Sequence, residues 1–180
     1  MEPSADHTAH SSADDLFDIV DERDAVIGTE RRAVVHGQGL RHRAVHILLQ
    51  NGKGEIFLQR RSPKKDMNPD CWDSSCSGHV DSGEDYDFSA VRELGEELGI
   101  AVAPGGIERV VKIEACRQTG HEFVWVYRGK HEGPFVLHPE EISDGRFWTV
   151  ADLERGIAQQ PREFSPAFRY IWSLVAGRFK

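Results

Sequence analysis

Cysteine is scarce in this sequence. Only Cys71, Cys76 and Cys116 occur among 180 residues. They are too few and too irregularly spaced for a disulfide framework or for a zinc site made of four thiolates. The default expectation is therefore a reducing compartment, the cytoplasm.

Long apolar runs are missing as well. No stretch reaches the roughly 20 residues that a membrane-spanning helix needs, and the first residues lack the basic and apolar regions of a signal peptide. The sequence predicts no membrane span and no membrane partner.

Basic residues are outnumbered by acidic ones. Lys and Arg number 22 against 30 Asp and Glu, which leaves a formal charge of −8. A surface with this balance is not typical of proteins that bind nucleic acid, so we expect no nucleic-acid partner. The length suits one domain with a substantial core. We expect a disordered polar tail at residues 1–14 and a single domain at residues 15–180.

Strand and helix patterns alternate along the chain. Asn51-Gly52-Lys53-Gly54 predicts a hairpin turn between two of the strands. We expect a small hairpin in residues 16–28, with strands at 16–20 and 25–28. We expect further strands at residues 43–50, 55–60, 110–114, 122–128 and 146–150, and helices at residues 85–98, 151–159 and 165–179.

The segment from Gly78 to Ile100, GHVDSGEDYDFSAVRELGEELGI, is the most informative part of the chain. Asp85 can cap the start of its helix, and Gly99 can end it in a left-handed conformation. Its apolar residues recur at helical spacing and predict one buried stripe, made of Phe88, Val91, Leu94 and Leu98. Three acids then fall on the opposite side of the helical wheel, namely Glu93, Glu96 and Glu97.

Between Glu84 and Leu98 there are six acids and a single base, Arg92. Glu93 and Glu97 are one helical turn apart, so their like charges repel and weaken the helix. A hard divalent cation, which prefers carboxylate oxygens, would relieve this repulsion. The alternative is a solvated acidic face without a ligand.

This spacing resembles the signature of the Nudix hydrolase family. The signature is a glycine, five residues, a glutamate, seven residues, and then REUXEEXGU, where U is aliphatic. Every defined position is filled, by Gly78, Glu84, Arg92, Glu93, Leu94, Glu96, Glu97, Gly99 and Ile100.

The resemblance implies an α/β fold, a Nudix-type α/β/α sandwich with a mixed sheet, in which the signature forms a loop-helix-loop active site. It also implies cleavage of a small-molecule diphosphate that depends on Mg²⁺ or Mn²⁺. Arg92 would orient the carboxylates, and Glu96 and Glu97 would bind metal, joined by the carbonyl of Ser77. Glu93 would be a further ligand or would activate water. Metal in such a site neutralises developing phosphate charge and lowers the pKa of the attacking water.

The flanking segments resemble a narrower branch, the type I isopentenyl-diphosphate isomerases. These are Nudix-fold enzymes that move a double bond. Within this resemblance Arg61 and Lys65 fall where the isomerases bind the substrate diphosphate. The resemblance rests on His42-Arg43-Ala44-Val45, Gln59-Arg60-Arg61-Ser62, Lys64-Lys65, Cys71-Trp72, Ser77-Gly78-His79 and Phe164-Ser165-Pro166. Four residues fall near the sequence positions of ligands to the isomerases' second metal, namely His36, His42, His79 and Glu122.

Three departures argue against isomerase chemistry. Ser77 stands at the position of the catalytic cysteine, Arg162 at that of an active-site tryptophan, and Gly120 at that of a metal ligand. An arginine opposes a carbocation that an aromatic face would stabilise. The sequence therefore favours a metal-dependent Nudix pyrophosphohydrolase. The alternatives are an isopentenyl-diphosphate isomerase and a non-catalytic Nudix module that binds a nucleotide.

Several points stay open at this level. The histidines are either ligands or hydrogen-bonded structural residues, and Phe123, Trp125 and Trp148 either stack on a base or pack in the core. Glu140 and Glu141 are either a mobile general base or an acidic turn. The substrate class is undetermined among nucleotides, nucleotide sugars, dinucleotides and prenyl diphosphates. A homodimer is expected by analogy with the family.

Overall fold

The computed structural model describes residues 14–103 and 105–179. All but the last residue of the tail expected at residues 1–14 lies outside these ranges. The strands are β1 (Leu16–Val20), β2 (Val26–Arg31), β3 (His42–Gln50), β4 (Ile56–Arg61), β5 (Trp72–Asp73), β6 (Cys76–His79), β7 (Ile107–Ile113), β8 (Glu122–Lys130) and β9 (Ile142–Trp148). The α-helices are α1 (Arg32–Gln38), α2 (Tyr86–Leu98), α3 (Val150–Gln159) and α4 (Pro166–Val175).

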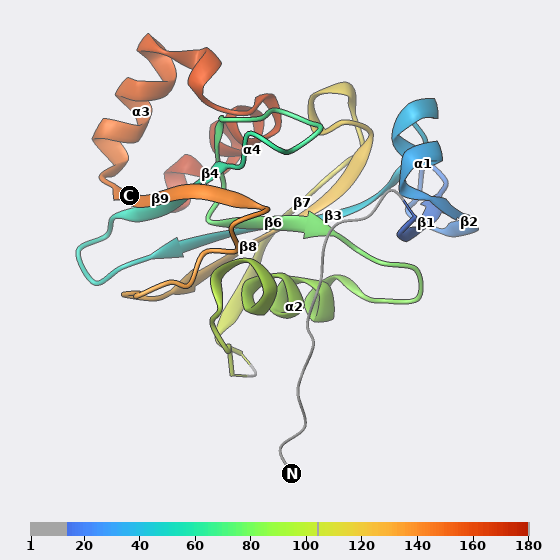
Figure 1. The fold of residues 1–180 in the computed structure, drawn as a ribbon, viewed down its shortest axis with the longest axis horizontal. Coiled ribbons are helices and arrows are strands. Elements are labelled where there is room, and N and C mark those ends of the chain that lie inside the picture. Colours follow the sequence, from blue (N-terminus) through green and yellow to red (C-terminus); the bar gives the residue numbers. More distant parts are fainter. Residues whose placement is uncertain (1–13, 104, 180) are drawn as a thin grey trace.

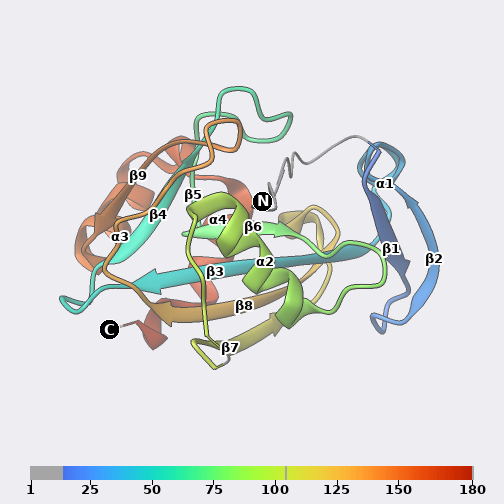
Figure 2. The same cartoon turned by 60° about the horizontal axis from the view of Figure 1, so that its bottom comes forward.

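A mixed sheet lies at the centre of the molecule, with helices on both sides. Its strand order is β5-β4-β3-β8-β7, with β6 paired to β3 and β9 paired to β4. The β3–β8 pair is parallel, and the other pairs of this sheet are antiparallel. Helix α2 covers one face, and α3 and α4 lie toward the other (Figures 1 and 2). The expected α/β/α arrangement with a mixed sheet is confirmed.

The sheet forks between β3 and β4. These strands pair only at Leu49 with Phe57 and at Gln50 with Ile56. Farther along, β3 pairs with β6 and β4 pairs with β5, so the two strands diverge. Figure 2 shows β4 leaving the direction of β3. The fork separates β6 from β5 and leaves room between them for side chains from α2.

Side chains of β3 point alternately to two apolar clusters, as the period of a strand requires. Val45, Ile47 and Leu49 pack with α2. Ala44 and Leu48 pack with residues of α3 and α4 on the other face. The near-continuous apolar run of β3 follows from burial on both sides.

Helix α2 begins and ends as the sequence predicts. The Asp85 side chain accepts a hydrogen bond from the N–H of Phe88 at 2.8 Å. Gly99 has φ of 64°, and its N–H donates to the carbonyl of Gly95 at 3.1 Å. This positive φ is a conformation that glycine adopts without the steric cost of a β-carbon.

The predicted apolar stripe of α2 is wrong for two of its four members. Leu94 and Leu98 are fully buried, but Phe88 is 58% and Val91 is 40% exposed. The buried face is rotated toward Ala90 and includes Glu97, which is only 6% exposed. The expectation that Glu97 projects opposite the apolar face is therefore also wrong, because the fork of the sheet accommodates this carboxylate inside the protein.

Short elements escaped prediction because pairing partners, and not local patterns, define them. Strand β6 has the unpromising sequence Cys-Ser-Gly-His, yet it pairs with β3 along its whole length. Helix α1 has no capping side chain at its start. Strand β2 runs from Val26 to Arg31, past the expected end at Gly28. Among the described residues, no helix is long and apolar enough to cross a membrane.

An aspartate whose side chain is 7% exposed ties the β1–β2 turn to the body of the protein. The Asp24 carboxylate accepts hydrogen bonds from Arg43 Nε at 2.6 Å, from the Tyr86 hydroxyl at 2.8 Å and from Lys112 Nζ. These partners come from β3, α2 and β7. Burial raises the pKa of Asp24, but the three donors outweigh it and hold the pKa below its ordinary 3.8.

We expect Asp24→Asn to lower the free energy of unfolding by about 3 kcal/mol at pH 7, because two cations lose their partner. Asn tolerates the positive φ of this position, so backbone strain does not contribute. The lowered pKa stabilises the fold above pH 3.8, and this contribution is lost as the pH falls through the folded-state pKa. The difference between wild type and variant, measured by urea unfolding, should shrink below about pH 4. Exposed Glu22→Gln is the control; an equal loss there would contradict the assignment.

Candidate active site

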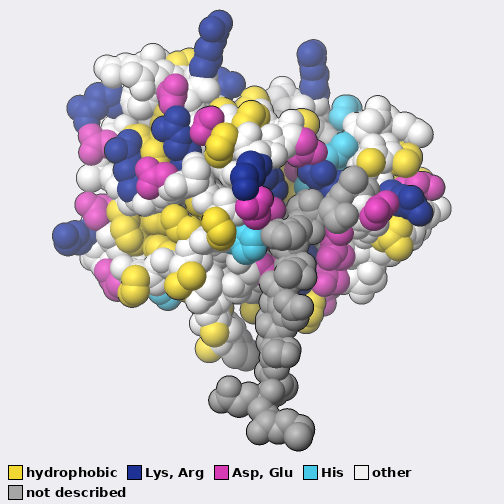
Figure 3. Space-filling view, in the orientation of Figure 1, with side chains coloured by type: hydrophobic (Ala, Val, Ile, Leu, Met, Phe, Trp, Pro, Cys, Tyr) yellow, Lys and Arg dark blue, Asp and Glu magenta, His cyan; other side chains and the backbone are white. Residues whose placement is uncertain are grey.

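One cavity of about 860 Å³ collects most of the residues singled out by the sequence. It lies where α1, α2, β6 and the loops after β4 and β8 meet. Acidic, basic and histidine side chains gather near the middle of the face seen in Figure 3. The cavity has three parts: the glutamates of α2, two basic residues after β4, and a group of histidines.

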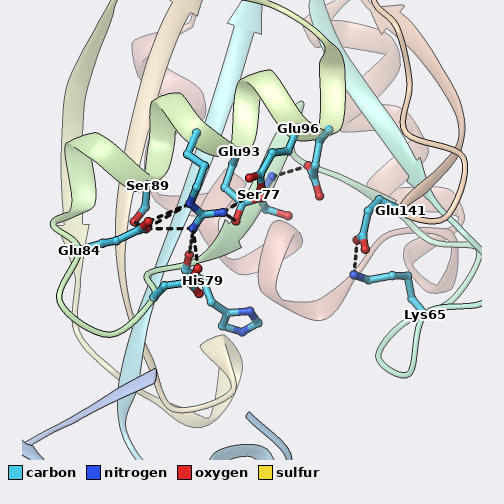
Figure 4. Close-up of polar contacts among 11 residues, drawn as sticks. Lys65, Ser77, His79, Glu84, Ser89, Glu93, Glu96 and Glu141 are labelled. Atoms are coloured by element: carbon cyan, nitrogen blue, oxygen red, sulfur yellow. Dashed lines mark hydrogen bonds and ion pairs between the residues drawn. The ribbon is translucent and has the colours of Figure 1, made fainter. Parts of the chain in front are cut away.

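Arg92 connects the acidic residues of the Nudix signature. Its Nη1 donates to Glu93 Oε1 and to Glu96 Oε2, both at 2.9 Å, and its Nε and Nη2 bond Glu84 at 3.1–3.2 Å. Nη2 also donates to the carbonyl of His79 at 3.1 Å. Figure 4 shows these carboxylates turned toward one guanidinium. Three acids that would repel one another are thus held close together by one cation.

Glu97 lies in the fork of the sheet. Its Oε2 accepts from Gln59 Nε2 of β4 at 3.1 Å and from the N–H of Ser77 of β6 at 3.2 Å. These two bonds fix one oxygen of the carboxylate between the diverging strands. The predicted role of the Ser77 carbonyl as a metal ligand stays a prediction.

Gly78 allows Glu93 to approach β6. A β-carbon at position 78 would lie 2.0 Å from the carboxyl carbon of Glu93, which is far inside van der Waals contact. The first glycine of the signature is therefore explained by close approach of a carboxylate to the strand.

Burial strongly disfavours the ionised forms of two of these glutamates. It raises the pKa of Glu97 to about 7. For Glu93, burial and the neighbouring charge of Glu97 raise the pKa well above its usual range, against the opposing effect of Arg92. Arg92 alone therefore does not balance this cluster. A divalent cation with a preference for oxygen ligands fits the donor set and would supply the missing positive charge.

A second group of ligand-type side chains lies in the same cavity. His36, His42, His79 and Glu122 come from α1, β3, β6 and β8, and their potential ligand atoms all lie within 4.8 Å of one another. Nε2 of His79 lies 3.2 Å from Nε2 of His36 and 3.1 Å from Glu122 Oε1. Phe17 stacks on the rings of His42 and His79 from one side. The structure thus brings the four predicted residues together.

The protonation of this group suits metal coordination. Burial, with the neighbouring histidines, lowers the pKa of His36 to about 4. Burial raises the pKa of Glu122, but the neighbouring rings of His42 and His79 outweigh this effect and leave the pKa well below the usual range. Nε2 of His42 is buried without a hydrogen-bond partner in the described structure, although it lies 3.4 Å from Glu122 Oε1. Neutral imidazoles and an ionised carboxylate are the forms that bind metal.

The predicted diphosphate-binding residues line the cavity near the glutamates. Arg61 Nε donates to the carbonyl of Met67 at 3.1 Å, and Nη1 lies 3.6 Å from Asp73 Oδ2. Lys65 forms an ion pair with Glu141 (Figure 4). Their neighbours Arg60 and Lys64 are not part of this cavity.

Two residues of the site have no role in the sequence analysis: Asp73, which lines the cavity, and Gln59, which binds Glu97. Gln59 stands two positions before Arg61 on β4 and therefore shares its face of the sheet. That alternation was a usable signal for Gln59. Asp73 lies opposite Gln59 on the neighbouring strand β5, and only the pairing of these strands reveals it.

The aromatic residues considered for base stacking lie elsewhere. Phe123, Trp125 and Trp148 are absent from the cavity wall, and the described residues that line it include no Trp or Tyr. The Arg109 guanidinium lies 4.6 Å from the centre of the Trp125 ring, and that of Arg146 lies 4.0 Å from Trp148.

The positions that depart from the isomerase pattern can also be located. Ser77 and Gly120 line the cavity. Cys76 is fully buried under α2, where burial and the nearby glutamates raise the pKa of its thiol well above the ordinary value. Cys76 therefore does not take over the role of a reactive thiol at position 77.

Comparison with known proteins agrees with this geometry. The family model described as the NUDIX domain matches residues 40–168, so the chain belongs to the Nudix family. An uncharacterized Nudix hydrolase from Yersinia pestis is 42% identical over 151 residues, which cover 83% of this chain and 79% of the relative. The enzyme class expected from the signature, a Nudix pyrophosphohydrolase, is confirmed.

Relatives of the isomerase type are also present. Isopentenyl-diphosphate Delta-isomerase 1 from Aromatoleum aromaticum is 31% identical, with coverage of 84% of this chain and 87% of the relative. The crystal structure of DR0079 from Deinococcus radiodurans matches with a TM-score of 0.71 and 30% identity, over 81% of this chain and 90% of that one. The expected similarity to both branches is confirmed.

We expect Gly78→Ala to weaken Mn²⁺ binding on the order of tenfold, because the new methyl group displaces Glu93. The fold should tolerate the change, since the clash involves only the flexible end of one side chain. Mn²⁺ affinity measured by electron paramagnetic resonance and the melting temperature together test this. Gly28→Ala, which meets nothing within 4 Å, is the matched control. Unchanged Mn²⁺ affinity in Gly78→Ala would contradict the role of Glu93 at the metal.

Proposed function

We propose that the protein hydrolyses a diphosphate linkage in a small organic molecule by attack of water, with Mg²⁺ or Mn²⁺ bound by Glu93, Glu96 and Glu97. The observation that carries this proposal is that Glu97 and the carboxylates of Glu93 and Glu96, which Arg92 holds, line one cavity together with Arg61 and Lys65. The cavity therefore combines carboxylates that can bind a cation with basic side chains that can bind a phosphate.

The protein's own groups have distinct tasks in this reaction. Arg92 holds Glu93 and Glu96 in place, and Gln59 with the N–H of Ser77 fixes one oxygen of Glu97. A metal held by Glu93, Glu96 and Glu97 would neutralise phosphate charge and lower the pKa of the attacking water. Glu93 or Glu97 accepts the proton of that water, and Arg61 and Lys65 bind the diphosphate.

The test is a panel of nucleotides, nucleotide sugars, dinucleotides and isopentenyl diphosphate with Mg²⁺ or Mn²⁺. We expect Glu97→Gln to lower kcat on the order of 10³-fold on the cleaved compound, because a ligand and possible proton acceptor is lost. Product identification by mass spectrometry and ³¹P spectra locates the broken bond. Exposed Glu114→Gln, which lies outside the cavity, should retain wild-type activity.

Two alternatives predict different results in the same panel. Conversion of isopentenyl to dimethylallyl diphosphate without cleavage would establish the isomerase, although Ser77 in place of a thiol argues against it because a hydroxyl has a far higher pKa. Nucleotide binding without metal-dependent turnover would establish the binding module. The complete set of glutamates argues against such a module, since binding alone needs no proton acceptor.

We further propose that His36, His42, His79 and Glu122 bind a transition metal such as zinc or manganese. The support is their mutual distance within 4.8 Å and the buried Nε2 of His42, which makes no hydrogen bond within the described structure. Imidazole with one carboxylate is a donor set that suits these ions. The alternative is a hydrogen-bonded histidine cluster without an ion.

We expect about one equivalent of bound metal in protein purified without chelator, and His36→Ala should lose it. Metal content by inductively coupled plasma mass spectrometry is the measurement, after passage through a desalting column. His131→Ala, which alters a histidine outside the cavity, is the control. If the purified wild type holds no metal and the Glu97→Gln variant takes up neither Zn²⁺ nor Mn²⁺ on titration, the four residues form a hydrogen-bonded cluster without an ion. The cytoplasmic location and the homodimer remain predictions.

A further inference from the structure

A buried acid lies directly behind one of the proposed diphosphate-binding residues. Asp73 on β5 is 3% exposed, and its Oδ2 lies 3.6 Å from Nη1 of Arg61. Its other oxygen, Oδ1, accepts a hydrogen bond from the N–H of Ser74 at 2.8 Å. The carboxylate is therefore attached to the strand and is not free to turn away from Arg61.

The far side of Asp73 is also packed with polar groups. The ring of His46, which is 5% exposed, places Nδ1 2.7 Å from the Ser74 hydroxyl and 3.8 Å from Asp73 Oδ1. Asp73 thus lies between His46 and Arg61, with a backbone donor on its third side. Such enclosure makes the position of this carboxylate well determined.

Arg61 is consequently held at two points of its guanidinium. Nη1 faces Asp73, and Nε donates to the carbonyl of Met67. The side chain is 15% exposed, and it lines the cavity together with Glu97. A planar guanidinium fixed along one edge can present its remaining N–H groups in a defined direction.

The negative charge of Asp73 partly cancels the positive charge that Arg61 offers to a diphosphate. If charge alone attracted the substrate, Asp73 would weaken binding. Lys65 also has an acidic partner, Glu141, but that residue comes from the loop before β9 and not from a buried strand. Lys65 and Glu141 both lie in loops, whereas Arg61 and Asp73 lie on the paired strands β4 and β5. The contribution of Asp73 must therefore be geometric.

We propose that Asp73 is a positioning residue, which fixes the Arg61 guanidinium for two-point binding of a diphosphate. This inference rests on the proposed function in one respect, the assignment of Arg61 to the diphosphate. The gain is preorganisation: the arginine loses little side-chain freedom when the substrate binds.

The test uses magnesium imidodiphosphate, a diphosphate that is not hydrolysed, and measures its Kd by calorimetry. We expect Asp73→Asn, which keeps the acceptor for Ser74, to weaken binding about tenfold at a temperature where circular dichroism shows the variant to be fully folded. Arg61→Met should weaken binding at least as much. In the Arg61→Met background, Asp73→Asn should have no further effect, because its target is gone.

A second variant leaves the buried acid untouched. Arg61→Lys keeps the charge but loses the planar fork, and we expect about the same tenfold loss. Wild-type affinity in Arg61→Lys would show that charge alone suffices and would overturn the inference. Equal or tighter binding by Asp73→Asn, or effects that add in the double variant, would overturn it too.

The outcomes separate this inference from the proposed function. If Arg61→Met binds imidodiphosphate as the wild type does, Arg61 does not contact the diphosphate, and that assignment falls together with the inference. If Arg61→Met binds weakly and Asp73→Asn does not, only the inference falls. Hydrolysis itself is judged independently by the loss of turnover in Glu97→Gln.

Discussion

The site depends on the hydrogen bonds that the Arg92 side chain donates. One guanidinium bonds three carboxylates and a backbone carbonyl of the strand β6, so it fixes the acidic face of α2 against the sheet. Without it, Glu84, Glu93 and Glu96 would repel one another. Its charge is nonetheless insufficient for the cluster, as the raised pKa values of Glu93 and Glu97 show. The fold thus holds these carboxylates in place, and their oxygens can still bind a further cation.

The fork in the sheet determines where this chemistry takes place. Because β3 and β4 pair at only two positions, β6 and β5 each gain an edge that faces the other across the gap. Glu97 enters this gap from one face, and Gln59 meets it there. Asp73 and Arg61 line the same gap on the β4 side. The proposed metal ligands and the proposed phosphate ligands are therefore neighbours although they come from distant segments.

Much of this was predictable from local spacing. The helix with its caps at Asp85 and Gly99 followed from the sequence, as did the longer strands of the sheet, although β5 and β6 did not. The rotation of α2 was not predictable. Phe88 and Val91 fit a helical stripe, yet they lie outside because the sheet accepts the small residue Ala90 and the carboxylate of Glu97 in their place. Apolar periodicity alone does not tell where a buried polar group has partners.

The sequence by itself determined the family and the kind of chemistry, because the signature places its carboxylates on consecutive turns of one helix. Only the tertiary structure decided what surrounds them. His36, His42, His79 and Glu122 come from four separate elements. Asp73 stands behind Arg61 only because β5 pairs with β4. Helical spacing is a local property of the chain, whereas these contacts depend on strand pairing and on the fork, which no local pattern encodes.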